Sequence, residues 1–215
     1  MKSILNLGAG KVNPNDFIDE YDFVVHLDRS YKRTQDDDEL LSIMEDIERK
    51  HIECVGGSGP IISFAPFDLF EFLDNYKYKF DHINADRIFE HQFYDSGEIG
   101  RLLDACNQIT TDDATMTIIV PNHLQLAKEL IAIEEGNIAV TKPDTYAPQV
   151  YAAHALKQCT EWQNTRCDPH GSVWTPQLAS YYIGCEGGTW KIDHIEQDIT
   201  HKGRSCYMMI ECSKP

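Results

Sequence analysis

The sequence predicts an α/β fold: a doubly wound, mostly parallel sheet of seven strands that closes with a C-terminal antiparallel hairpin. Short apolar runs alternate with amphipathic helical stretches along the chain, as in sheets whose strands are covered on both faces. The first apolar run ends abruptly in the turn Gly8-Ala9-Gly10. The last two strand-like segments, 189–199 and 205–212, are separated by a short turn containing Gly203, which favours an antiparallel pair.

Six elements are predicted in the N-terminal part of the chain. In order, they are a strand at 3–7, a short helix or turn at 14–20, a strand at 22–27, a helix at 36–50, a short strand at 61–64 and a short helix from Asp68. The first strand shows little polar alternation, as expected of a strand buried on both faces. The helix at 36–50 opens with acidic residues and repeats apolar residues at helical spacing.

The remaining elements continue the alternation. In order, they are a strand at 80–86, a helix at 97–108, a strand at 114–120, a helix at 124–135, a helix around 151–163, a helix at 176–185 and the closing hairpin. Pro121 stops the strand before it, and Pro176 stands at a position where proline opens a helix. We expect a single domain over residues 1–215, with residues 137–175 as a cap or insertion.

Composition and charge narrow the class of protein. The 215 residues are 42% hydrophobic and 25% charged, enough for one core but too few for two ordinary domains. Apolar runs stay well short of the roughly 20 residues of a membrane span. The first strand follows Met1 directly, so we expect no leader and a cytoplasmic location. The net charge of -16 repels phosphate backbones, so we expect no nucleic-acid partner.

The seven cysteines are scattered and contain no CxxC pair. Reduced thiols are therefore expected rather than a disulfide framework. A group such as Cys159, Cys167, His170 and Cys185 matches no common zinc spacing, so no metal site is predicted.

A glycine turn and a strand-terminal acid indicate a nucleotide site. Gly8 and Gly10 let the backbone approach a ligand where a Cβ would collide. Asp28 ends the second strand, where a carboxylate accepts hydrogen bonds from a ribose diol. The alternative is a structural turn, with Asp28 as a cap for the following helix.

Further motifs extend this pattern. They are Leu5-Asn6-Leu7-Gly8-Ala9-Gly10, Leu27-Asp28, Pro66-Phe67-Asp68, the segment Phe80–His91 with its F-D-x-I start and E-H end, and Ile118-Ile119-Val120-Pro121-Asn122. Together with the closing hairpin, they resemble the motifs of class I S-adenosylmethionine (SAM)-dependent methyltransferases, which have a Rossmann-like sheet. Within that family, the chain is most similar to small methyltransferase-like proteins found in phages and near surface-polysaccharide genes.

The resemblance implies a cofactor, SAM, and a set of residues that contact it: Asn6, Gly8, Gly10, Asp28, Arg29, Asp68 and Asp86. For two of these residues, a structural role is as well supported as a cofactor contact. Arg29 could instead pair with the acidic residues 36–39, and Asp68 could instead cap the next helix. Methyl transfer needs a general base only when the acceptor must lose a proton, and the candidates for that role are His91, His170 and His123.

The segment Asp168–Trp174 has two interpretations. Its polar side chains and indole either line the acceptor pocket, as part of a cap folded over the ligand rim, or form an ordered turn. In the second case Trp174 fills the core and Thr175 caps the helix that starts at Pro176.

Two functions follow from these observations. The first is a SAM-dependent methyltransferase that acts on a small molecule, a sugar or a protein group. The second is a structural or interaction protein with the methyltransferase fold and with catalysis lost or incidental. It would have protein assembly partners in a particle such as a phage, and would be found in the host cytoplasm or the virion. The run Lys11-Val12-Asn13-Pro14 favours the second function, because it replaces a third glycine and the helix formers expected after it.

Overall fold

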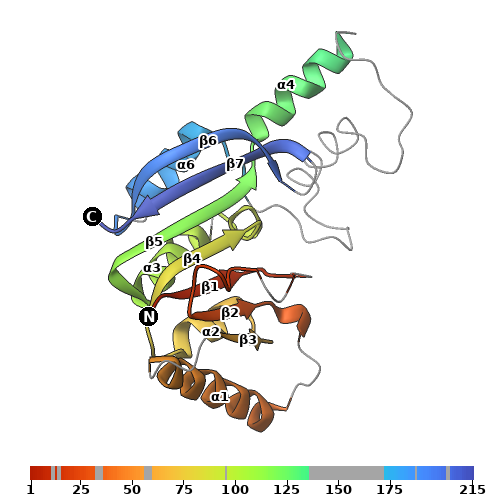
Figure 1. Cartoon of the computed structure of the whole chain (residues 1–215). Coiled ribbons are helices and arrows are strands. Elements are labelled where there is room, and N and C mark those ends of the chain that lie inside the picture. The colour runs from red at the N-terminus through yellow and green to blue at the C-terminus, as the bar shows by residue number, and fades with distance from the viewer. Residues whose placement is uncertain are drawn as a thin grey trace.

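Seven strands form a single sheet in the computed structural model of the chain (Figure 1). The structure describes residues 1–10, 13, 16–31, 36–55, 60–94, 96–135, 172–186, 188–201 and 204–215. The strand order is β3-β2-β1-β4-β5-β7-β6. Neighbouring strands from β3 to β5 pair in parallel, and β7 is antiparallel to both β5 and β6. This confirms the predicted seven-stranded sheet with its closing hairpin.

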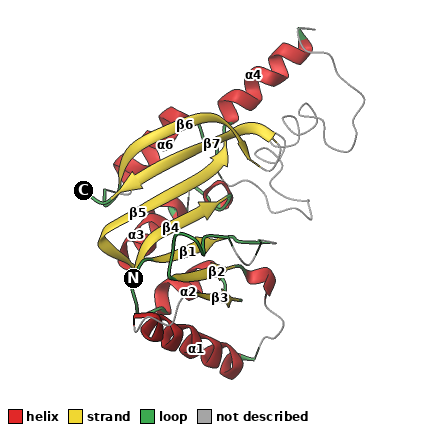
Figure 2. Cartoon of the chain, in the orientation of Figure 1, coloured by secondary structure: helices red, strands yellow, loops and turns green. Residues whose placement is uncertain are grey.

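The bounds of the elements are close to those predicted (Figure 2). The strands are β1 Ser3–Leu7, β2 Phe23–Leu27, β3 Ile61–Ala65, β4 Phe80–Asp86, β5 Thr110–Pro121, β6 Lys191–His201 and β7 Arg204–Ser213. The helices are α1 Asp37–Val55, α2 Leu69–Asn75, α3 Glu98–Gln108, α4 His123–Glu134 and α6 Pro176–Tyr181, with short turns η1 Arg29–Tyr31, η2 Phe89–His91 and η3 Tyr182–Glu186. None of these helices has the length and apolar character needed to cross a membrane.

Three predicted elements differ most from the structure. Helix α1 continues past residue 50, because His51 and Cys54 extend its buried face. Strand β5 begins at Thr110, four residues earlier than predicted, through a polar stretch that the apolar pattern did not mark. The helix predicted at 176–185 divides into α6 and the π-helical turn η3. The helix predicted at 151–163 lies outside the described residues.

The main core lies on one face of the sheet. Alternate strand residues such as Leu5, Val25, Ile83, Met116 and Ile210 belong to one buried cluster with residues of α1, α2, α3 and α6. Because side chains alternate along a strand, the residues between them face the other side. Figure 1 shows α2, α3 and α6 behind the sheet.

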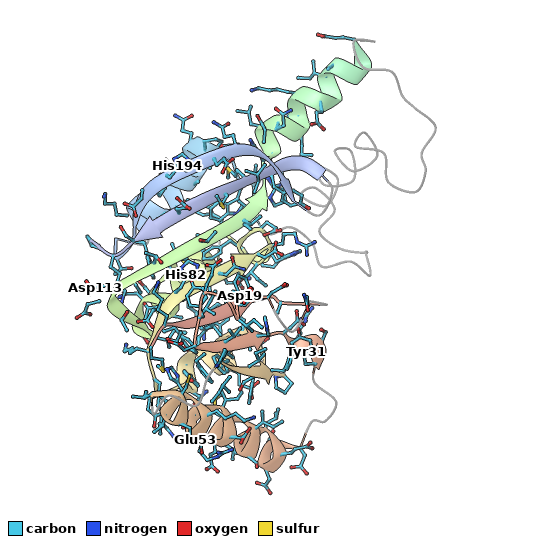
Figure 3. The ribbon with its side chains drawn as sticks, viewed as in Figure 1. Asp19, Tyr31, Glu53, His82, Asp113 and His194 are labelled. Atoms are coloured by element: carbon cyan, nitrogen blue, oxygen red, sulfur yellow. The ribbon has the colours of Figure 1, made fainter. Side chains whose placement is uncertain are left out.

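The opposite face is covered differently. Residues 16–22, which form turns where a short helix or turn was predicted, place Phe17 against His26 and Tyr21 against His82. The ring centroids of these two pairs are 6.4 and 5.8 Å apart, respectively. Figure 3 labels His82 on this face and Asp19 in the segment that crosses it.

Trp174, just before α6, connects this helix to the turn that follows β4. Its side chain is fully buried, and its indole Nε1 donates to Ser172 Oγ at 2.8 Å. Ser172 Oγ in turn donates to the carbonyl of Phe89, and Thr175 Oγ1 accepts from the backbone N–H of Leu178. These contacts match the interpretation in which Trp174 fills the core and Thr175 caps the helix. Residues 137–171 of the predicted cap lie outside the described part.

Replacing Trp174 by alanine is expected to lower the free energy of unfolding by about 3–5 kcal/mol, because a large buried ring is lost and a cavity remains. The matched control is Val173→Ala, at a neighbouring side chain that is 38% exposed, with an expected change within about 0.5 kcal/mol. Urea unfolding followed by circular dichroism measures both. Equal stability of the two variants would contradict the assignment of Trp174 to the core.

Candidate functional site

A cleft of about 640 Å³ opens at the carboxyl ends of the parallel strands. Its walls are Gly8 after β1, residues 27–30 at the end of β2, residues 67–70 before and within α2, and the turn after β4, which contributes Arg87-Ile88 and residues 91–93. In open α/β sheets this rim is where ligands bind, because loops and helix starts leave a crevice there. The cleft therefore coincides with the predicted nucleotide site.

The Asp28 carboxylate organises the β1 side of the cleft. Its Oδ2 accepts from the backbone N–H of Gly10 and its Oδ1 from that of Ser30, each at 2.7 Å. The hydroxyl of Tyr31, labelled in Figure 3, donates to the carbonyl of Gly10 at 2.5 Å. Asp28 itself lines the cleft. The Asp28 carboxylate therefore both holds the glycine turn and lines the cleft.

Gly8 is required by both conformation and space. Its φ is +64°, in the left-handed region that side chains disfavour. A Cβ at Gly8 would stand 2.3 Å from Cδ1 of Ile88, well inside van der Waals contact. The turn after β4 therefore closes directly onto the glycine turn, and this contact forms one wall of the cleft.

Arg29 and Asp68 both line the cleft, as predicted cofactor contacts would. Asp68 is also the N-cap of α2: its side chain accepts from the N–H of Phe70 at 3.1 Å, and Glu71 completes a capping box. The two alternatives for Asp68 are thus compatible, since a capping carboxylate at a strand end still borders the crevice.

Asn6 is directed away from the described walls of the cleft. Its side chain is 2% exposed, accepts from Asn84 Nδ2 at 2.8 Å and donates to His26 Nδ1 at 3.1 Å. Asp86, at the end of β4, forms an ion pair with Nε of Arg87 at 3.2 Å. Gly10, Asn6 and Asp86 therefore support the described walls of the cleft rather than line them.

The three candidate histidines have different surroundings. His91 lines the cleft. His123 is 3% exposed, and its Nδ1 accepts from the backbone N–H of Trp174 at 3.0 Å. Burial lowers the pKa of His123, against the raising effect of its backbone hydrogen bonds to Trp174 and Pro121. His170 lies outside the described residues. Of the described candidates, His91 alone borders the cleft.

Three residues outside the predicted set shape this site: Ile88, Tyr31 and Asn84. Ile88 closes onto Gly8, Tyr31 holds the carbonyl of Gly10, and Asn84 fixes Asn6. Each lies within one or two residues of a strand end or of a predicted site residue, but residue type alone does not mark it.

Glu90 is a buried acid behind the turn after β4. Its side chain is 1% exposed, and within the described ranges its Oε2 has no hydrogen-bond partner. Burial raises the pKa of the Glu90 carboxyl to about 8, with Asp86 acting in the same direction and Arg87 opposing it. At neutral pH this raised pKa favours the protonated form of the Glu90 carboxyl.

Gly8→Ala is expected to destabilise the protein by more than Gly97→Ala, by about 1–3 kcal/mol. Both positions have a left-handed φ, +64° and +73°, but a Cβ at Gly97 meets no atom within 4 Å. The control thus contains the backbone strain without the clash. Adding Ile88→Ala to Gly8→Ala should recover part of the loss, which a double-mutant cycle measures by urea unfolding. Additive single effects would contradict the clash.

Between pH 5 and pH 8, the free energy of unfolding is expected to fall less with rising pH in Glu90→Gln than in the wild type. In the unfolded chain the carboxyl ionises near its ordinary pKa of 4.5, while in the folded protein it stays protonated up to about 8. Stability from this group is therefore present below the unfolded pKa and is lost as the pH rises. Relative to the variant, the wild type should lose about 2 kcal/mol or more over this range. Parallel pH profiles in urea unfolding would contradict a buried protonated Glu90.

Comparison with known proteins gives the fold a name. No family model and no curated protein matches the sequence. Among solved structures, the chain is similar to SAM-dependent methyltransferases from Methanosarcina mazei and Clostridium acetobutylicum. Identity is 12% to each, with TM-scores of 0.53 and 0.56. The matches cover 99% of this chain and 92% and 84% of those chains, respectively.

The pyocyanin biosynthetic protein PhzM is a third match. It is 16% identical to this chain, with a TM-score of 0.54 over 100% of this chain. The chain spans 50% of the length of PhzM. With the strand order, the closing hairpin and the position of the cleft, these matches show that the chain has the class I methyltransferase fold.

Proposed function

We propose that this protein is a SAM-dependent methyltransferase. The observation that carries the proposal is Asp28, a strand-terminal carboxylate that lines the cleft and holds the adjacent glycine turn. The solved structures that share the fold include enzymes described as SAM-dependent. Their fold and the chemistry of this cleft point to the same cofactor.

The residues of the cleft fit SAM. A carboxylate offers about four acceptor positions, and Asp28 uses two of them for Gly10 and Ser30, which leaves two for the hydroxyls of a ribose. Gly8 lines the cleft beside that position. Residues 67–70 supply an apolar wall, with Phe67 and Phe70, where an adenine ring would pack.

Bound SAM supplies a methyl group activated by a positively charged sulfur. The protein's part is to hold the acceptor in line with that group and to exclude water. On the acceptor side, the turn after β4 contributes Arg87, Ile88 and His91 to the cleft. In this proposal, His91 would take the proton from an acceptor that must lose one, because it is the described histidine that lines the cleft.

The acceptor is a small molecule, a sugar or a protein group in this proposal. A cytoplasmic location, a cap formed by residues 137–175 and a relation to phage or polysaccharide-locus proteins belong to the proposal as well. The alternative is a structural protein with this fold, and one observation favours it. Residues 16–22 form turns between β1 and β2, so the described part of this connection contains no α-helix with its N-terminus aimed at a cofactor.

Asp28→Asn is expected to weaken binding of SAM and S-adenosylhomocysteine by about 10- to 100-fold, because it removes the charge from the acceptor. Isothermal titration calorimetry measures this. The control is Asp74→Asn, at an exposed acid paired with Arg101 on the helical side. Equal affinities of wild type and Asp28→Asn would falsify the assignment of Asp28. A wild type that binds neither compound would favour the structural alternative.

A further inference from the structure

Arg87 has an uncommon backbone conformation at the rim of the cleft. Its φ is +58°, in the left-handed region, and its N–H donates to the carbonyl of Ile119 at 2.8 Å. Glycine adopts this conformation without strain, so the turn itself does not call for an arginine. Non-glycine residues in such strained conformations cluster at ligand sites. We therefore examine whether the guanidinium of Arg87 can bind a ligand.

The guanidinium of Arg87 is only partly satisfied within the described residues. Its Nε donates to Asp86 Oδ1 at 3.2 Å, and 38% of the side chain is exposed. Among the described residues, the structure gives its terminal amino groups no acceptor. These groups carry four of the five N–H donors of an arginine, and Arg87 lines the cleft.

Charged side chains line both sides of the cleft. The acids Asp28 and Asp68 stand at the ends of β2 and β3, beside Arg29, and both are hydrogen-bonded to backbone N–H groups. The side formed by the turn after β4 contributes Arg87 and His91 and no acid among its described lining residues. In a chain with a net charge of -16, a cation kept at this position indicates a specific counter-charge on the ligand.

Few charged groups act on Arg87. The groups that act on it electrostatically are Asp86, Tyr207 and Glu90. Tyr207 is neutral at physiological pH, and burial raises the pKa of Glu90 to about 8, so Glu90 is neutral as well. Asp86 is then the one charged partner among these three, through a single hydrogen bond to Nε.

We propose that Arg87 binds an anionic group of the methyl acceptor, a carboxylate, phosphate or sulfate, in the half of the cleft formed by the turn after β4. The proposal rests on the methyltransferase function proposed above. The planar fork of a guanidinium matches two oxygens of such a group, which fixes the orientation of the acceptor as well as its position. The acceptor class is thereby narrowed to compounds or protein groups that carry negative charge.

The test is a titration of the protein, saturated with S-adenosylhomocysteine, with sulfate as the probe at constant ionic strength. Sulfate keeps its double charge over neutral and alkaline pH, so the protein alone accounts for any pH dependence. NMR chemical-shift changes give the affinity. Arg87→Gln should weaken sulfate binding at least tenfold, and Arg87→Lys should lie between it and the wild type. The control is Arg49→Gln, an exposed arginine of α1 paired with Asp46 and Glu53, which should bind as the wild type does.

A second test measures how the affinity for sulfate depends on pH. As the pH rises through about 8, ionised Glu90 adds a negative charge beside Arg87 and Asp86, so the wild type should lose affinity for sulfate. Glu90→Gln should keep its affinity over the same range. This measurement needs no change at Arg87, so it decides the question even where Arg87→Gln does not fold.

Three outcomes would overturn the proposal: no sulfate binding by the wild type, equal binding by Arg87→Gln and wild type, or displacement of S-adenosylhomocysteine by sulfate. The last outcome would assign Arg87 to the carboxylate of the cofactor instead. Failure of the proposed function looks different, because the protein would then bind no S-adenosylhomocysteine at all. Sulfate titration of the cofactor-free protein would still measure the anion site in that case.

Discussion

The close approach of Gly8 and Ile88 is the constraint on which the cleft depends. Two turns in left-handed conformations meet there, one at Gly8 after β1 and one at Arg87 after β4. The absence of a side chain at Gly8 lets Ile88 cover it, and that brings the turn after β4 over the sheet edge. Arg87, Ile88 and His91, which line this side of the cleft, all belong to that turn.

The other side of the cleft is prepared by hydrogen bonds that exist without a ligand. Asp28 holds Gly10 and Ser30, and Tyr31 holds the carbonyl of Gly10. These bonds fix the carboxylate in the structure without a ligand, so binding of a ligand there would not have to order it. Behind them, Asn6 donates to His26 Nδ1 and accepts from Asn84, which joins three polar side chains of neighbouring strands on the opposite face.

Much of this arrangement could be predicted from the sequence, because strand ends and glycine turns leave local signals. Asp28 and Asp68 stand at the cleft as expected. The side of the sheet to which Asn6 points could not be predicted, since an apolar run without alternation does not mark its faces. The left-handed backbone conformation of Arg87 could not be predicted either, because arginine is not a residue type that favours it. His123 follows a strand as predicted, but its surroundings depend on Trp174, which is distant in sequence.

The central position of β1 has a consequence for how the chain folds. Its first residue, Ser3, donates hydrogen bonds to the Asp81 carboxylate from both its backbone N–H and its hydroxyl, and residues 4–7 pair with β4. A ribosome must therefore release the chain as far as Asp86, about 40% of its 215 residues, before β1 has its second neighbouring strand. Contacts so far apart in sequence form slowly, because a long loop must close first. The cleft can therefore form only after β4 and the turn that follows it, up to Phe93, have left the ribosome.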